Sequence, residues 1–171
     1  AIPTAERALV ICEKTLGHEH PDTATTIYNM AMLYYNSGNY DKAEQLIERA
    51  LEIYEKVMGP EHVIVAQSLN NLGEILRAKS NYSKAEAHYR RSNTIYKSTL
   101  GPDHPDTSIP INNLALLYLS LGNTAQAEPL FQECLRIWER SFGPDHPNIA
   151  QLLSNIAALN VLRGNYDKAE E

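Results

Sequence analysis

The chain has 171 residues, of which 43% are hydrophobic and 21% are charged, and its formal net charge is −6. Nine Pro and eight Gly are too few for a collagen-like or low-complexity chain, and the hydrophobic fraction is too high for a disordered one. The acidic balance argues against nucleic acid as a partner, because affinity for phosphate backbones comes mainly from Lys and Arg.

The apolar stretches near residues 31–35 and 114–119 are the longest in the chain. They fall far short of the roughly 18 residues that a membrane-spanning helix requires. The chain does not open with a basic segment and an apolar core, and two cysteines cannot form the disulfide framework of a small secreted domain. We therefore expect no membrane partner, a reducing environment and a cytoplasmic location.

A repeat of 42 residues organises the sequence from its first residue to its last. Each copy starts at a histidine, and the four are His20, His62, His104 and His146. The predicted complete units are 20–61, 62–103 and 104–145. Residues 146–171 begin a further unit, and residues 1–19 match the second helix of a preceding one. We predict a single array over 1–171, with both ends looking cut from a longer array.

Each unit is predicted to contain two helices. Ile27, Met30, Ala31 and Tyr34 follow helical spacing in the first helix. After a break at 37–39, where Gly or Asn supplies the left-handed residue of a helix end, a second apolar stripe runs from Ala43 to Val57. The second helices are predicted to stop at Gly59, Gly101 and Gly143.

Prolines and aspartates lie near the predicted helix starts, and we expect them not to break the helices and to cap them, respectively. Pro110 and Pro129 are interpreted as lying near first turns, where a missing N–H costs little, so neither is read as a break. In the His-Pro-Asp turns we expect the histidine to pack locally and Asp22 or Asp106 to cap the next helix.

These residues resemble the tetratricopeptide repeats (TPR), and in particular the 42-residue variety found in kinesin light chains. In the first complete copy the family pattern is met by Ile27, Met30-Ala31, Tyr34, Ala43 and Ile47, and the later copies repeat it. The fourth copy departs from the pattern at Asn160, where Tyr is expected, and its match ends at Ala169. The resemblance implies an all-α fold, an α-solenoid of helix-turn-helix units in a right-handed superhelix. Eight residues beyond the usual 34 would lengthen the second helix after Ala50.

In this family the first helices line a concave groove that accepts peptide segments. Four asparagines recur at the 42-residue period on the predicted first helices: Asn29, Asn71, Asn113 and Asn155. An amide both donates to and accepts from a peptide backbone, and by resemblance we assign these residues to ligand backbone. The alternative is that each bonds a neighbouring helix and sets the geometry of the repeats.

Neighbouring groove positions vary between units, so they are expected to choose the ligand's side chains. The predicted selectivity residues are Tyr28, Gln67, Asn70, Arg77, Ile109, Asn112 and Gln151. The Lys and Arg that grip chaperone carboxylates in related proteins are missing from this set, apart from Arg77. The three complete units carry net charges of −4, +3 and −3, so an acidic ligand across the middle unit is a secondary hypothesis.

Catalytic and metal chemistry are not predicted. Histidines one repeat apart are separated by about one helix diameter, roughly 10 Å, whereas two ligands of one zinc each lie near 2 Å from it. The sequence has no phosphate-binding loop or nucleophile elbow, and Cys12 and Cys134 fall on apolar stripes. Trp138 has the phase of Tyr54 and is expected to pack between units. We predict no enzyme, no cofactor and no metal.

The leading functional prediction is an interaction scaffold or adaptor that binds peptide segments of partner proteins. The rival is a structural spacer or self-association module of a larger regulatory or enzymatic protein, with the exposed array ends pairing with another copy. A third hypothesis makes the chain the sensor part of an enzyme. The middle unit, with His88, Ser92 and Asn93 at apolar positions, is expected to open first in hydrogen exchange.

Overall fold

The computed structural model describes residues 2–162 and Gly164, and all regular structure within them is helical. This confirms the all-α prediction. The elements are α1 (Ile2–Thr15), α2 (Pro21–Asn36), α3 (Tyr40–Met58), α4 (Val63–Ala78), α5 (Tyr82–Leu100), the 3-10 helix η1 (Pro105–Thr107), α6 (Ser108–Ser120), α7 (Thr124–Phe142) and α8 (Pro147–Leu162). Ala169, which completes the predicted fourth match, lies outside the described residues.

The predicted two-helix unit is present as α2 with α3, α4 with α5, and η1 and α6 with α7. The second helices α3, α5 and α7 each have 19 residues, whereas the first helices α2 and α4 have 16. In α3 the extra length follows Ala50, as the resemblance implies, and the helix continues to Met58.

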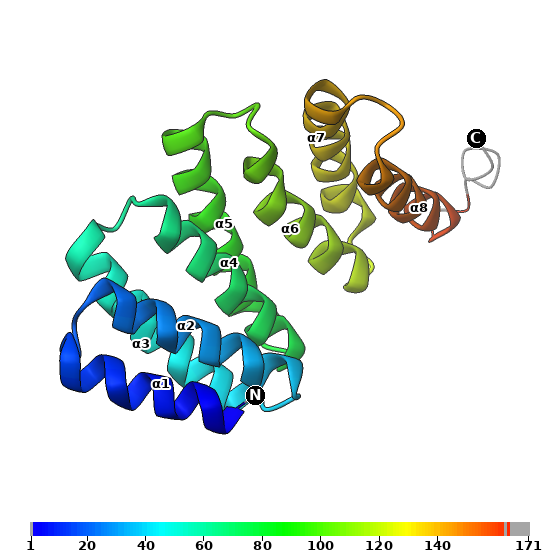
Figure 1. The fold of residues 1–171 in the computed structure, drawn as a ribbon. Helices are drawn as coiled ribbons and strands as arrows, with labels where there is room; N and C mark the ends of the chain where they lie inside the picture. Colours follow the sequence, from blue (N-terminus) through cyan, green and yellow to red (C-terminus); the bar gives the residue numbers. More distant parts are fainter. Residues whose placement is uncertain (1, 163, 165–171) are drawn as a thin grey trace. The chain divides into compact units, whose positions relative to one another are not determined.

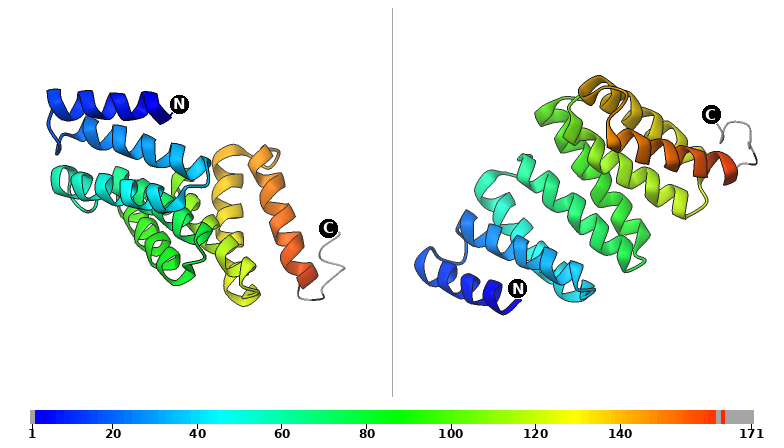
Figure 2. Two further views of the ribbon diagram at one scale, coloured as in Figure 1. Left: turned by 90° about the horizontal axis from the view of Figure 1, so that it is seen from below. Right: turned by 45° about the vertical axis from the view of Figure 1, so that its right-hand side comes forward.

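The chain forms two compact units, residues 1–95 and 96–171. In the first unit α1 packs against α2, α2 against α3, and α3 against α4 (Figure 1). In the second unit η1 and α6 pack against α7, and α7 packs against α8 (Figure 2). Whether residues 1–171 form a single array stays a prediction.

The apolar stripes form the core within each unit. Ile27, Ala31 and Ala43 are fully buried in the first unit, and Ala115 and Phe131 are fully buried in the second. Gly73 of α4 lies close to the second helix of its unit, since an added Cβ would lie 2.6 Å from Cε1 of the buried Tyr89 ring. Gly73 therefore allows α4 and its own second helix α5 to approach each other.

A histidine side chain caps the starts of α2, α4, η1 and α8. His20 Nδ1 accepts a hydrogen bond from the Asp22 backbone N–H at 3.2 Å. The same 3.2 Å bond recurs at His62, His104 and His146. Our prediction that Asp22 or Asp106 caps the helix was wrong, because each follows the capping histidine by two residues and donates its N–H to it. Histidine at the first position of the repeat thus takes the place usually held by Ser, Thr, Asp or Asn.

The prolines change the helices in different ways. Pro110 lies in the first turn of α6, and the backbone immediately before this helix is the 3-10 turn η1. Pro110 has no N–H to donate to the preceding turn, which explains why the regular α-helix starts later than in α2. Pro129 lies further inside α7 than expected, but the helix continues through it, so the prediction that it is not a break is confirmed.

The turn inside each unit needs one residue with positive φ. That residue is Gly38 (φ 79°) in the first complete unit and Gly122 (φ 71°) in the third, but it is Ser80 (φ 61°) in the second. The neighbouring asparagines do not take this conformation, since Asn39 has φ −86° and Asn123 has φ −84°. Ser80 therefore carries a steric cost that the glycines avoid.

Replacing Ser80 with Gly is expected to stabilise the chain by about 0.5–1 kcal/mol, because the left-handed conformation costs an L-residue more than Gly. The melting temperature should rise by about 1–3 °C in a calorimetric scan. The matched change Gly122→Ser should lower it. A destabilised Ser80→Gly variant would contradict this account of the turn.

The middle repeat places polar groups at apolar positions, and they differ in how they are accommodated. Ser92 is fully buried and donates to the Ala66 carbonyl at 2.7 Å. Asn93 Oδ1 is buried without a hydrogen bond from the described residues. His88 is half-buried, and burial lowers its pKa from the ordinary 6.5, with Arg91 and Lys84 adding to the effect and Glu44 opposing it.

The lowered pKa of His88 predicts a loss of stability in acid. The unfolded chain takes up a proton as the pH falls through 6.5, whereas the folded chain resists protonation, so stability is complete above that pH and declines below it. Leu46 and Leu130 occupy the same phase, so His88→Leu should weaken the decline in melting temperature between pH 7.5 and 5. The exposed His18→Gln serves as the control. An equal decline in wild type and His88→Leu would exclude His88 as its source.

Candidate functional site

Predicted site residues of the first unit meet at a small cleft. It has a volume of about 120 Å³ and lies where α2, α3 and α4 come together. Its lining residues are Thr25, Tyr28 and Asn29 from α2, Tyr54 from α3, and Ile64 and Gln67 from α4. Three of the predicted selectivity or backbone-binding residues, Tyr28, Asn29 and Gln67, are therefore brought together.

Hydroxyl groups inside the cleft are held by hydrogen bonds. The Tyr54 hydroxyl donates to Thr25 Oγ1 at 3.0 Å, and Thr25 Oγ1 donates to the Pro21 carbonyl at 3.1 Å. Burial raises the pKa of both Tyr28 and Tyr54 above 10, although the hydrogen bond from Asn71 to Tyr28 and the one from Tyr54 to Thr25 oppose the shift. Both phenols therefore keep their protons near neutral pH.

Asn71 connects successive first helices. Its Nδ2 donates to the Tyr28 hydroxyl on α2, and its Oδ1 accepts a hydrogen bond from Asn70 Nδ2 at 3.3 Å. Asn70 is itself only 6% exposed. The contacts of Asn71 favour the alternative in which the repeated amide sets the geometry between helices.

Asn29 differs from Asn71 although both have the same phase in the repeat. Its side chain is exposed, it lines the cleft, and it makes no hydrogen bond to other described residues. Its donor and acceptor groups are accessible to a ligand backbone. In the first unit, therefore, the two members of the asparagine series have different surroundings.

Arg77, the basic candidate, belongs to a half-buried cluster on α4 and α5. Its Nη2 lies 3.1 Å from Glu74 Oε2, and the Tyr89 hydroxyl donates to Glu74 Oε1 at 2.5 Å. Burial opposes the positive charge of Arg77, but Glu74 outweighs it and the pKa of Arg77 is raised. Burial and the Glu74 charge raise the pKa of Tyr89 strongly. An anionic ligand at Arg77 would have to compete with Glu74.

The second unit carries the remaining predicted site residues on α6 and α8. Ile109 is 40% exposed and Gln151 is exposed, whereas Asn112, Asn113 and Asn155 are half-buried. Asn112 Oδ1 is buried and accepts no hydrogen bond from the described residues. Their ligand contacts stay a prediction, as do those of the first unit.

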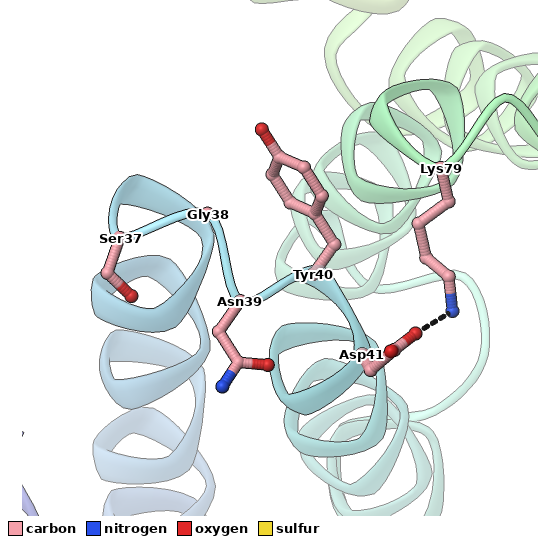
Figure 3. Close-up of a pocket in the computed structure, with 6 residues that line it drawn as sticks. All are labelled: Ser37, Gly38, Asn39, Tyr40, Asp41 and Lys79. Carbon is pink, nitrogen blue, oxygen red and sulfur yellow. Dashed lines mark ion pairs between the residues drawn. The ribbon is translucent and has the colours of Figure 1, made fainter.

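A larger hollow lies at the turn between α2 and α3 (Figure 3). It has a volume of about 570 Å³ and is lined by Ser37, Gly38, Asn39, Tyr40, Asp41 and Lys79. Lys79 Nζ lies 2.5 Å from both Asp41 Oδ1 and Glu44 Oε2, and these carboxylates raise the pKa of the lysine. Figure 3 shows the Tyr40 ring directed away from this ion pair. Sequence analysis did not single out this hollow, because Asp41 and Lys79 have no counterpart at the same phase in the third repeat.

Among the described residues, no three His, Cys, Asp or Glu side chains are grouped as metal ligands. Cys134 is fully buried and its Sγ lies 3.6 Å from the Ser108 carbonyl, while burial raises the pKa of its thiol. Trp138 is half-buried and its Nε1 donates to Ser108 Oγ. None of the described helices is long and apolar enough to span a membrane.

Comparison with known proteins extends over the whole sequence. A family model described as tetratricopeptide repeat matches residues 1–56, 24–98, 81–137 and 107–171. The structure of BtubC (BKLC) from P. vanneervenii is similar with a TM-score of 0.86 and 27% identity, over 97% of this chain and 66% of that one. A search of curated proteins gives no match.

Two further structures share the fold at lower identity. A kinesin-light-chain-like protein of Podosopora anserina with nearly identical TPR-like repeats gives a TM-score of 0.82 and 23% identity, over 99% of this chain and 80% of that one. Aspartyl phosphate phosphatase F from Bacillus subtilis gives 0.79 and 19%, over 88% and 38%. These comparisons confirm the predicted repeat class and the helical-solenoid fold.

Because Asn71 bonds a neighbouring helix and Asn29 does not, replacing Asn71 should destabilise the fold more than replacing Asn29. Asn71→Ala should lower the free energy of unfolding by about 1 kcal/mol, because it removes the hydrogen bond between α4 and Tyr28 of α2. Asn29→Ala should change it by less than about 0.5 kcal/mol, since the side chain is exposed. Urea denaturation of the two variants measures both values, and equal losses would contradict the distinction.

Proposed function

Because the chain belongs to the tetratricopeptide-repeat family, we propose that it binds peptide segments of partner proteins. Repeats of this family generally serve as protein–protein interaction scaffolds and are typically non-catalytic. We propose that the chain acts as a kinesin-light-chain-like adaptor without catalytic activity, cofactor or metal, and that it is located in the cytoplasm.

The cleft of the first unit is the observation that carries this proposal. It is small, and Ile64 together with the rings of Tyr28 and Tyr54 gives it apolar walls. Such a space suits one apolar side chain of a ligand, while Thr25 and Gln67 add polar groups that restrict its orientation. Asn29 stands at the same cleft with its amide exposed, where it can bond the ligand backbone.

The asparagine series then has divided roles. Asn29 contacts ligand backbone, whereas Asn71 holds α4 to Tyr28 and so shapes one wall of the cleft. Asn113 and Asn155 are proposed to contact ligand from the second unit, with Ile109, Asn112 and Gln151 beside them. Asn70 and Arg77 are satisfied by neighbouring side chains and are proposed to act mainly by positioning.

Similarity to BtubC supports the repeat fold on which the proposal rests, since it covers nearly the whole of this chain at 27% identity. The chain spans 66% of that protein.

Selection from a random peptide library on the immobilised chain tests the proposal. Peptides that bind should share one apolar residue, and their affinity is measured by fluorescence anisotropy. Asn29→Ala and Gln67→Arg should each weaken binding by about threefold to tenfold. Asn29→Ala removes roughly one hydrogen bond to the ligand, and Gln67→Arg fills the cleft with a larger side chain.

Two exposed residues provide matched controls. Asn36→Ala changes another exposed asparagine of α2, and Gln45→Arg makes the same charge change on the exposed face of α3. Both should leave the affinity unchanged. Selected peptides that bind all four variants as tightly as wild type would place the ligand elsewhere and overturn the assignment of the cleft.

A further inference from the structure

The histidine that caps α4 holds a residue that also lines the cleft of the first unit. His62 Nδ1 accepts a hydrogen bond from the Ile64 backbone N–H at 3.2 Å. The Ile64 side chain forms part of the cleft wall, and Gln67 lines the cleft from the next turn of the same helix. The α4 side of the cleft therefore depends on this cap.

The Ile64 N–H lies before the first backbone hydrogen bonds of α4. The His62 carbonyl accepts from the Val65 N–H at 2.9 Å and from the Ala66 N–H at 3.3 Å. The first N–H groups of a helix have no partner within the helix, and here the His62 side chain supplies one for Ile64. Without that acceptor, the first turn of α4 loses a bond that orders it.

The cap requires a neutral ring at His62. Nδ1 can accept a hydrogen bond only while it carries no proton, and both ring nitrogens of a protonated histidine are donors. Histidine side chains ordinarily change charge at about pH 6.5. The positive end of the helix dipole also disfavours a cation at this place. The bond to Ile64 is therefore present above the pH range in which His62 is protonated and is lost below it.

The cap of α2 has a neighbouring carboxylate that the cap of α4 lacks. Asp22 Oδ2 lies 3.7 Å from His20 Nδ1. A protonated His20 can bond this carboxylate, which keeps the ring at the start of α2 after the bond to the backbone N–H is lost. The equivalent residue after His62 is Ile64, which has no charge. Acid should therefore loosen α4 more than α2.

The other charged groups near the start of α4 do not replace this carboxylate. Glu61 and His62 are both exposed, and neither forms an ion pair with the described residues. The charged residues in the last part of α3, which packs against α4, are held by other partners. These ion pairs are Glu55–Arg91 at 2.6 Å and Lys56–Glu19 at 2.5 Å. A protonated His62 thus has no acceptor in the position that Asp22 takes beside His20.

We propose that peptide binding at the cleft is regulated by pH through His62. Protonation of its ring releases the Ile64 N–H, loosens the first turn of α4 and weakens the binding of a ligand at the cleft. This inference rests on the function proposed above, because it concerns ligand affinity at the same cleft. The residues of α2 that line the cleft keep their positions, since Asp22 compensates the charge of His20.

NMR of the chain without ligand tests the loss of the cap. Between pH 7.5 and 5, the 13Cα chemical shifts of Val63 and Ile64 should move toward random-coil values. They should do so in step with the ring signal of His62. The shifts of Thr23 and Ala24, in the first turn of α2, should move much less.

Three variants separate the cap from other effects of acid. His62→Asn keeps an acceptor at the cap that does not titrate, so the Val63 shift should no longer depend on pH. Ile64→Asp supplies the carboxylate found at position 22 and should keep the Val63 shift helical at pH 5. His104→Asn makes the same change at the cap of η1, where Asp106 Oδ2 lies 4.0 Å from Nδ1, and should leave the Val63 titration as in wild type.

Fluorescence anisotropy tests the effect on binding. The probes are peptides selected on the immobilised chain that contain no Asp, Glu or His, so that their own charge stays constant. The wild-type dissociation constant should rise about twofold to fivefold from pH 7.5 to 5, because the ordered first turn of α4 becomes less populated. His62→Asn should bind equally well at both pH values, and His104→Asn should behave as wild type. Circular dichroism at both pH values checks that each variant is folded.

Two results would overturn the proposal. One is a Val63 shift that stays constant while the ring signal shows that His62 takes up its proton. The other is a rise in the dissociation constant that His62→Asn retains in full. A chain that binds no peptide at either pH contradicts the proposed function instead, and the Val63 shift then still decides whether the cap responds to pH.

Discussion

The close approach of each first helix to its own second helix is the constraint on which the structure depends. Between α4 and α5, Gly73 faces the buried ring of Tyr89, and an added Cβ would stand 2.6 Å from Cε1 and 2.8 Å from Cδ1. The other complete repeats use Ala31 with Ile47 and Ala115 with Phe131 at these phases, all fully buried. A small residue on the first helix is thus matched to a larger one on the second.

The proposed ligand surface follows from this packing. Within the first unit, α2 and α4 both pack against α3, which brings Tyr28, Gln67 and Tyr54 to one cleft. The hydrogen bond from Asn71 to Tyr28 then ties the two first helices together. The proposed ligand binding therefore involves side chains that also determine helix spacing.

Periodicity made most of the fold predictable, because four copies in phase fix which residues face the core and where helices end. Where either of two neighbouring residues could take the same structural role, the sequence did not predict which one takes it. His20 caps α2 instead of Asp22, and Ser80 rather than Asn81 takes the positive φ. The bond from Asn71 to Tyr28 and the cluster of Glu74 with Tyr89 join residues of different phase, so repeat alignment gave no signal for them.

A double-mutant cycle at Gly73 and Tyr89 tests the central claim most directly. The account predicts that Gly73→Ala destabilises the chain when Tyr89 is present, because the ring lies where the added methyl group would stand. With Tyr89→Ile, the combination found at Ala31 and Ile47, Gly73→Ala should be harmless or stabilise by up to about 1 kcal/mol, the difference in helix propensity. An equal free-energy change for Gly73→Ala in both backgrounds would contradict the account.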